Sequence, residues 1–124
     1  MSCEIQVFCE INPSEDPSKV KTAILNIFPD LEISISAELL IGKSNDIGTL
    51  SNISESIHTK NTKNTYQRIL KKNSNENSTW FYLNKQAAFV STVALCNESD
   101  ESPLGPIKVV LEANDIENLI QSLT

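Results

Sequence analysis

The sequence predicts an α+β protein in which helices pack on a mainly antiparallel sheet. Several short stretches alternate apolar and polar residues, which is typical of half-buried strands. Other stretches repeat apolar residues every three or four positions, as amphipathic helices do. The two kinds follow one another in the order β-α-β-β-α-α-β-β-β-α, in which hairpins join neighbouring strands. The length of 124 residues predicts one domain, residues 1–124.

The chain opens with a strand followed by a helix. Residues 3–11 alternate, and a polar turn at residues 12–15 ends the strand. Asp16 before Pro17 is the pairing expected for an N-cap and a first helical position. Apolar residues then recur at helical spacing until Pro29, which ends the helix.

The middle of the chain predicts a hairpin and two helices. Residues 31–36 and 39–41 form two strands joined by a tight turn at residues 36–38. From Asp46 the apolar period changes to that of a helix, and a second helix is expected over residues 64–72.

Three strands and a helix are expected in the last third. The strands cover residues 79–83, 89–96 and 106–111, and the second of them is rich in β-branched side chains. Asn114 is the predicted N-cap of the final helix, with Glu117 as its capping-box partner.

Composition argues against catalysis, metals and cofactors. One His and three scattered Cys offer no zinc-binding spacing, and no serine lies in a nucleophile-elbow sequence. Only 3 Gly are present, which disfavours glycine-rich phosphate loops. The apolar runs are too short to cross a membrane. An odd cysteine count without a targeting signal predicts a cytoplasmic protein.

A basic segment stands out in an acidic chain whose formal net charge is −6. Residues 56–75 contain no Asp or Glu, and we expect their five basic side chains to contact RNA phosphates: Lys60, Lys63, Arg68, Lys71 and Lys72. The alternative is a solvated helix face. Tyr66 lies among them and either stacks on a base or packs in the core.

A polar triplet, Asn84-Lys85-Gln86, interrupts an apolar run that begins at Trp80. It forms either a turn between two strands or a small recognition cluster for phosphate, ribose or a base edge. In the strand before it, Trp80 and Tyr82 are expected on the face opposite to Phe81.

Two further segments carry a resemblance that spans nearly the whole chain. FYLNKQAAF (residues 81–89) and ESPLGPI (101–107), with the turn at 12–16, resemble a family of small conserved archaeal proteins of uncharacterised function. The resemblance implies an α+β domain similar in fold to the ribosomal protein that binds 5S rRNA, grouped with predicted RNA-binding domains. It implies no catalytic residues. Residues 51–64 depart from the pattern, being rich in Asn, Thr and Ser where a more charged helix is usual.

The sequence therefore predicts a protein that is not an enzyme and that binds RNA or a ribonucleoprotein through the basic segment and the triplet Asn84, Lys85 and Gln86. The alternative is a protein-interaction module or homodimeric scaffold without nucleic-acid binding, joined through an exposed strand edge. A third hypothesis, an enzyme acting on a small anionic metabolite, requires a pocket that converges on Lys85.

Overall fold

The computed structural model describes residues 3–96 and 105–124, and within them the predicted α+β class is confirmed. The strands are β1 (Cys3–Glu10), β2 (Glu32–Ser36), β3 (Leu39–Ser44), β4 (Ser78–Asn84), β5 (Leu95–Cys96) and β6 (Pro106–Ala113). The helices are α1 (Pro17–Ile27), α2 (Ser51–Thr59), α3 (Lys63–Lys72), α4 (Lys85–Phe89) and α5 (Ile116–Leu123), and a short 3-10 helix, η1 (Ile47–Leu50), leads into α2. The acidic segment 97–103 lies outside the described residues.

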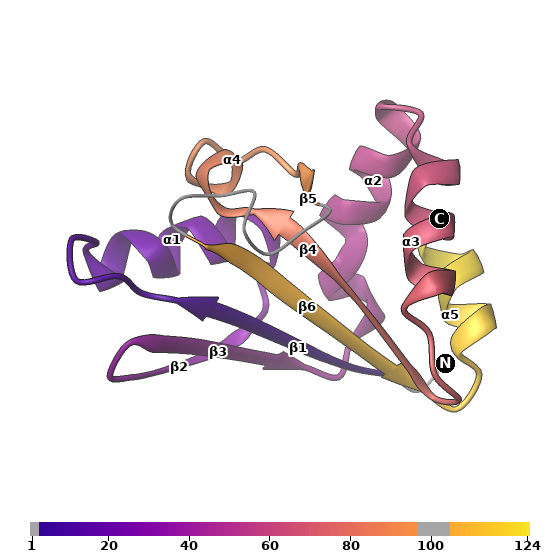
Figure 1. The fold of residues 1–124 in the computed structure, drawn as a ribbon, viewed down its shortest axis with the longest axis horizontal. Helices are drawn as coiled ribbons and strands as arrows, with labels where there is room; N and C mark the ends of the chain where they lie inside the picture. Colours follow the sequence, from indigo (N-terminus) through magenta and orange to yellow (C-terminus); the bar gives the residue numbers. More distant parts are fainter. Residues whose placement is uncertain (1–2, 97–104) are drawn as a thin grey trace.

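The strands form one sheet in the order β2-β3-β1-β6-β4-β5, and the neighbouring strands are antiparallel. The first and last strands pair at its centre, where Val7 of β1 faces Val109 of β6. In Figure 1, α1 lies along one end of the sheet, whereas α2, α3 and α5 group near the other end. The predicted hairpin of β2 and β3 is confirmed, with Ala37 in its turn at a φ of 53°.

The sheet has one covered face and one open face. On the covered face the strand side chains are buried against the helices; Ile5, Val7, Phe81, Leu83, Val109 and Leu111 are each fully buried. The residues that alternate with them are half-buried or exposed, so no helix covers their side. This difference between the two faces determines where a ligand has access to the sheet.

The start of α1 follows the predicted capping pattern. The Asp16 side chain accepts a hydrogen bond from the Ser18 backbone amide, and Pro17 is the first helical residue. The helix buries an apolar stripe that ends at Phe28, whose side chain is fully buried.

The predicted strand over residues 89–96 is wrong in most of its length. The Asn84 side chain accepts a hydrogen bond from the Ala87 amide at 3.0 Å and so begins helix α4. Only Leu95 and Cys96 pair with β4, and Val90 is 73% exposed. The β-branched residues suggested a strand, but a side-chain cap and two alanines favour a helical turn directly after β4.

The final helix also begins differently from the prediction. The N-cap is Asp115, whose side chain accepts from the Asn118 amide, so the predicted Asn114 is one residue early. Asp and Asn are nearly equal as N-caps, and sequence patterns place helix ends only to within a residue or two. The amphipathic stripe of α5 packs into the core as predicted.

Candidate nucleic-acid interface

The open face of the sheet carries three aromatic side chains and a lysine on three adjacent strands. Phe8 lies on β1, Trp80 and Tyr82 on β4, and Lys108 on β6 between them. Tyr82 is opposite Lys108, and Lys108 is opposite Phe8, so the side chains form one row across the sheet. We call Phe8, Trp80, Tyr82 and Lys108 the aromatic cluster.

Contacts within the aromatic cluster fix the orientation of its rings. The Trp80 and Tyr82 ring centroids are 5.1 Å apart, and the ring planes meet at 63° in an edge-to-face arrangement. The Lys108 ammonium lies 5.0 Å from the Trp80 ring centroid, within cation–π range. All four side chains are half-buried, so each keeps exposed surface. The cluster therefore offers aromatic surface and a positive charge to a ligand on this face.

Alternation along β4 places Phe81 and Trp80 on opposite faces, as predicted, and the structure shows which face is the core. Phe81 and Leu83 are fully buried, whereas Trp80 and Tyr82 are half-buried on the opposite face. Phe81 packs edge-to-face on Tyr66 of α3, with ring centroids 5.9 Å apart. Burial raises the pKa of Tyr66 to about 12. Of the two alternatives for Tyr66, core packing is therefore the one observed.

Four of the basic side chains lie on α3 and one lies before it. A hydrogen bond connects the end of this helix to β4. Lys63, Arg68, Lys71 and Lys72 are exposed on this helix. The Asn73 side chain, just after the helix, donates to the Trp80 carbonyl oxygen at 3.0 Å. The C-terminal turn of α3, with Lys71 and Lys72, is thereby held next to the strand that carries the aromatic cluster.

Lys60 has a different place from the α3 side chains. It follows the last turn of α2, and its ammonium donates to the Val93 carbonyl oxygen at 2.9 Å. This contact ties α2 to the segment between α4 and β5. The structure thus groups four of the five predicted basic residues on one helix and gives the fifth a contact within the fold.

The residues of the triplet have three separate surroundings. Asn84 is the N-cap of α4, and Gln86 is exposed on that helix. Lys85 is fully buried, with its ammonium 2.8 Å from the Glu15 Oε1 atom and 2.6 Å from the Glu10 carbonyl oxygen. The three side chains do not converge on one surface and so do not form one recognition cluster.

The ion pair of Lys85 and Glu15 joins the turn after β1 to the start of α4. Glu15 Oε1 also accepts from the backbone and side-chain nitrogens of Asn12, at 2.9 and 2.8 Å. Burial raises the pKa of Glu15, but the hydrogen bonds from Lys85 and Asn12 outweigh it and hold that pKa below its usual value. Burial also raises the pKa of the neighbouring Cys9 to about 11.

A cavity of about 380 Å³ opens beside the aromatic cluster at one end of the open face. Its lining combines aromatic, aliphatic and charged side chains: Phe8, Cys9, Glu10, Leu39, Tyr82, Gly105, Pro106 and Lys108. This volume lies within the range of about 300–1,000 Å³ that is usual for small-molecule sites. Glu10 and Lys108 bring one acceptor group and one donor group to it.

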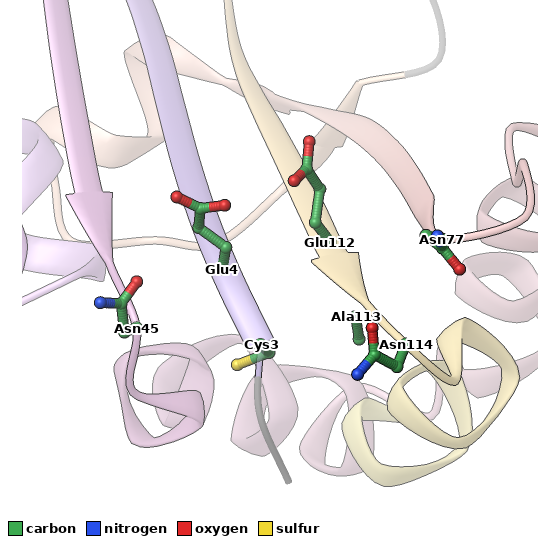
Figure 2. A pocket seen from close by; sticks show the side chains of 7 residues that line it. All are labelled: Cys3, Glu4, Asn45, Asn77, Glu112, Ala113 and Asn114. Carbon is green, nitrogen blue, oxygen red and sulfur yellow. The ribbon is translucent and has the colours of Figure 1, made fainter.

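The opposite end of the open face is acidic. Figure 2 shows the carboxylates of Glu4 and Glu112 projecting to the same side from adjacent strands; the two residues are directly opposite each other in the register. With Asn45, Asn77 and Asn114 they line a cavity of about 450 Å³. In residues 3–96 and 105–124, no group of three or more His, Cys, Asp or Glu is arranged to hold a metal ion. Two adjacent carboxylates repel phosphate, so this end disfavours a nucleic-acid backbone.

A family model described as RNA binding matches residues 4–113. The chain belongs to this family. A UPF0201 protein of Methanothermobacter thermautotrophicus is 42% identical over 120 residues, which cover 97% of this chain and 89% of that protein. A UPF0201 protein of Sulfurisphaera tokodaii is 35% identical over 125 residues, which cover 98% of this chain and 86% of that protein. The predicted resemblance to an archaeal family of uncharacterised proteins is thereby confirmed.

Solved structures of UPF0201 proteins share the fold. The crystal structure of the one from Methanococcus jannaschii matches with a TM-score of 0.83 at 31% identity, covering 97% of this chain and 98% of that one. A second UPF0201 crystal structure matches with a TM-score of 0.77 at 37% identity, and the match covers 90% of this chain and 83% of that one. The expected similarity to the ribosomal protein that binds 5S rRNA is tested by neither match and stays a prediction.

One relative is a longer protein whose name combines UPF0200 with UPF0201. A protein of Archaeoglobus fulgidus named UPF0200/UPF0201 is 37% identical over 114 residues, which make up 91% of this chain but 34% of that protein. The matched region is therefore part of a longer chain in that species. Among the helices described for the present chain, none is both long and apolar enough to cross a membrane.

Proposed function

We propose that this protein binds single-stranded RNA on the open face of its sheet, without catalysing a reaction. The observation that carries the proposal is the aromatic cluster, in which three rings and a lysine are accessible on adjacent strands. Unpaired RNA bases stack on exposed aromatic side chains, and sheet faces with such rings are a recurring form of RNA recognition. The family description, RNA binding, supports the same ligand.

The phosphates of the bound strand lie toward α3. The hydrogen bond from Asn73 to the Trp80 carbonyl holds the end of this helix beside β4. Because α3 packs on the covered face through Tyr66, a strand that stacks a base near Trp80 reaches the exposed Lys71 and Lys72 by passing around β4. The carboxylates of Glu4 and Glu112 at the acidic end of the face keep the backbone away from that side.

Single strands fit this face better than duplexes do. Bases within a helix are stacked on each other and have no free ring faces, whereas an unpaired strand offers one face per base. The formal net charge of −6 also gives no general attraction to duplex phosphates. We place this function in the cytoplasm, which the odd number of cysteines in the sequence supports.

Fluorescence anisotropy with a labelled single-stranded RNA of about twelve nucleotides tests the proposal. Tyr82→Ala is expected to weaken binding roughly tenfold, because stacking contributes about 1–3 kcal/mol per base. Phe89→Ala is the matched control, since Phe89 is also an exposed aromatic but lies on α4, away from the open face. Equal losses in the two variants, or no binding by the unaltered protein, would contradict the proposal.

A second candidate function is docking of another protein on the open face. The name of the Archaeoglobus fulgidus relative favours it, because a UPF0200 part shares one chain with the region matched here. Parts that share a chain in one species can associate as separate chains elsewhere. Light scattering after nuclease treatment distinguishes the candidates: a homodimer or a stable complex with a UPF0200 protein, without RNA retention, would favour docking.

A further inference from the structure

We infer that the cavity beside Phe8 and Tyr82 binds a guanine base of the RNA and reads its Watson–Crick edge through the carboxylate of Glu10. The inference rests on the RNA-binding function proposed above, and it adds a base preference and a residue that determines it. Glu10 is the last residue of β1 and shares the open face with Phe8.

The main chain at Glu10 is anchored although its side chain is exposed. The buried Lys85 ammonium donates to the Glu10 carbonyl oxygen at 2.6 Å, and the ion pair with Glu15 holds that ammonium in place. On the open side, Glu10 Oε2 lies 3.9 Å from the position that a Cβ atom on Gly105 would occupy. The carboxylate is thus directed along the cavity edge next to a glycine backbone.

The carboxylate of Glu10 remains available for a ligand. It is exposed, and within the part of the chain that the structure describes it takes part in no hydrogen bond or ion pair with another side chain. The nearby carboxylate of Glu15 differs, because its Oε1 atom is bonded to Lys85 and Asn12. Glu10 therefore brings two acceptor oxygens, which have no side-chain partner among the described residues, to a cavity lined by aromatic rings.

The walls of the cavity suit a planar base. Phe8 and Tyr82 lie on either side of Lys108 in the cross-strand row, and Pro106 and Leu39 add apolar surface. A base that stacks on one of the rings points its polar edge along the sheet. Glu10 and Lys108 line the same cavity, so the edge meets the acceptor oxygens of Glu10, and the Lys108 ammonium turns from the Trp80 ring to donate to the base.

Guanine is the base whose edge matches these groups. Its N1–H and N2–H donors lie side by side and can bond to both oxygens of one carboxylate, while its O6 and N7 accept from lysine. Adenine and cytosine place an unprotonated ring nitrogen beside their amine, and a carboxylate repels that nitrogen. Uracil has a single N–H between two carbonyl oxygens. Charge-assisted bidentate bonds are the strong ones, so the preference for guanine should be measurable.

The test compares RNAs that differ at one base. Octamers of uridine that carry one central guanine, adenine or inosine are titrated by fluorescence anisotropy. The unaltered protein is expected to bind the guanine octamer roughly tenfold more tightly than the adenine octamer. Inosine lacks the N2 amine, so the affinity for its octamer should lie between the affinities for the guanine and adenine octamers.

Glu10→Gln is the decisive variant, because an amide offers one acceptor and one donor group in place of two acceptors. It should lose the preference for guanine and shift it toward adenine, whose N6 amine and N1 atom match the acceptor and donor of an amide. Glu112→Gln is the matched control, since it removes the same charge from an exposed residue on the same face but at the acidic end. It should keep the roughly tenfold preference for guanine.

The outcomes separate this inference from the proposed function. If the unaltered protein binds none of the octamers, both the guanine site and the RNA-binding function are overturned. Binding without a base preference, or an equal loss of preference in Glu10→Gln and Glu112→Gln, overturns the guanine site and leaves RNA binding intact. Circular dichroism confirms that the variants are folded, and Glu10→Asp, which keeps the charge but shortens its reach, should also lose the preference.

Discussion

The covered and open faces of the sheet use the same kinds of side chain for different purposes. Phe81 on the covered face is fully buried and packs on Tyr66, whereas its neighbour Tyr82 on the open face is half-buried beside Trp80. Lysines differ in the same way, since Lys85 is enclosed with Glu15 and Lys108 lies over an accessible ring. Residue type alone therefore does not indicate a role; the face on which the residue lies does.

The largest effect is expected from truncation of the covered face. Phe81→Ala should lower the free energy of unfolding by about 3–5 kcal/mol, because it removes a fully buried ring from a packed core. Urea unfolding followed by circular dichroism measures the change. Tyr82→Ala should cost much less stability while it weakens RNA binding. Equal destabilisation by the two variants would remove the distinction between the faces.

The buried ion pair should have the next largest effect. Lys85→Met leaves the carboxylate of Glu15 buried without its partner, and should lower the free energy of unfolding by up to about 3–5 kcal/mol. The double variant with Glu15→Leu should recover part of the loss, since it removes the uncompensated charge. A loss in Lys85→Met no larger than that in the control Lys108→Ala would show that the pair contributes little.

The ion pair also predicts an acid dependence of stability. The pKa of Glu15 is lowered in the folded protein, so the contribution of this carboxylate is present above its usual pKa, near 4.5, and is lost as the pH falls through the lower folded value. Unfolding measured between pH 6 and pH 3 should therefore show a steeper decline in the unaltered protein than in Glu15→Gln. Parallel curves would contradict the assignment. Glu55→Gln, at an exposed residue of α2, is the control.

The smallest effect concerns the basic helix. If Lys71 and Lys72 each contact a phosphate, replacing both with Ala should reduce the slope of log affinity against log salt by about 1.4, since each contact adds about 0.7 for single strands. Replacement of Lys19 and Lys21, which are exposed on α1, removes the same charge elsewhere. A similar reduction in both double variants would indicate a general charge effect and exclude α3 as the phosphate contact.

Sequence patterns identified most of the fold because the signals are local. Alternation placed Phe81 and Trp80 on opposite faces of β4, and Asp16 with Pro17 marked the start of α1. The prediction was wrong after Asn84, where β-branched residues such as Val90 indicated a strand. A side-chain cap on a short helix competes with strand propensity there, and only the folded geometry decides between them.

The candidate site was harder to predict because it is made of residues far apart in the chain. Phe8, Tyr82 and Lys108 become neighbours only when β6 pairs with both β1 and β4. The half-buried alternation of each strand was visible in the sequence, but it does not indicate that helices leave this face uncovered. The sequence predicted a recognition cluster at the polar triplet instead, and one of its members, Lys85, donates to the Glu10 carbonyl oxygen from within the fold.

The sequence by itself determined the fold class, the separation of Phe81 from Trp80 onto opposite faces and the basic character of the segment around α3, because these depend on local periodicity and charge. The tertiary structure alone decided which strands are adjacent, which face remains open and that Lys85 is enclosed with Glu15. Those outcomes depend on pairings between residues as distant as Glu15 and Lys85, and a buried charge is stable only where such a partner meets it.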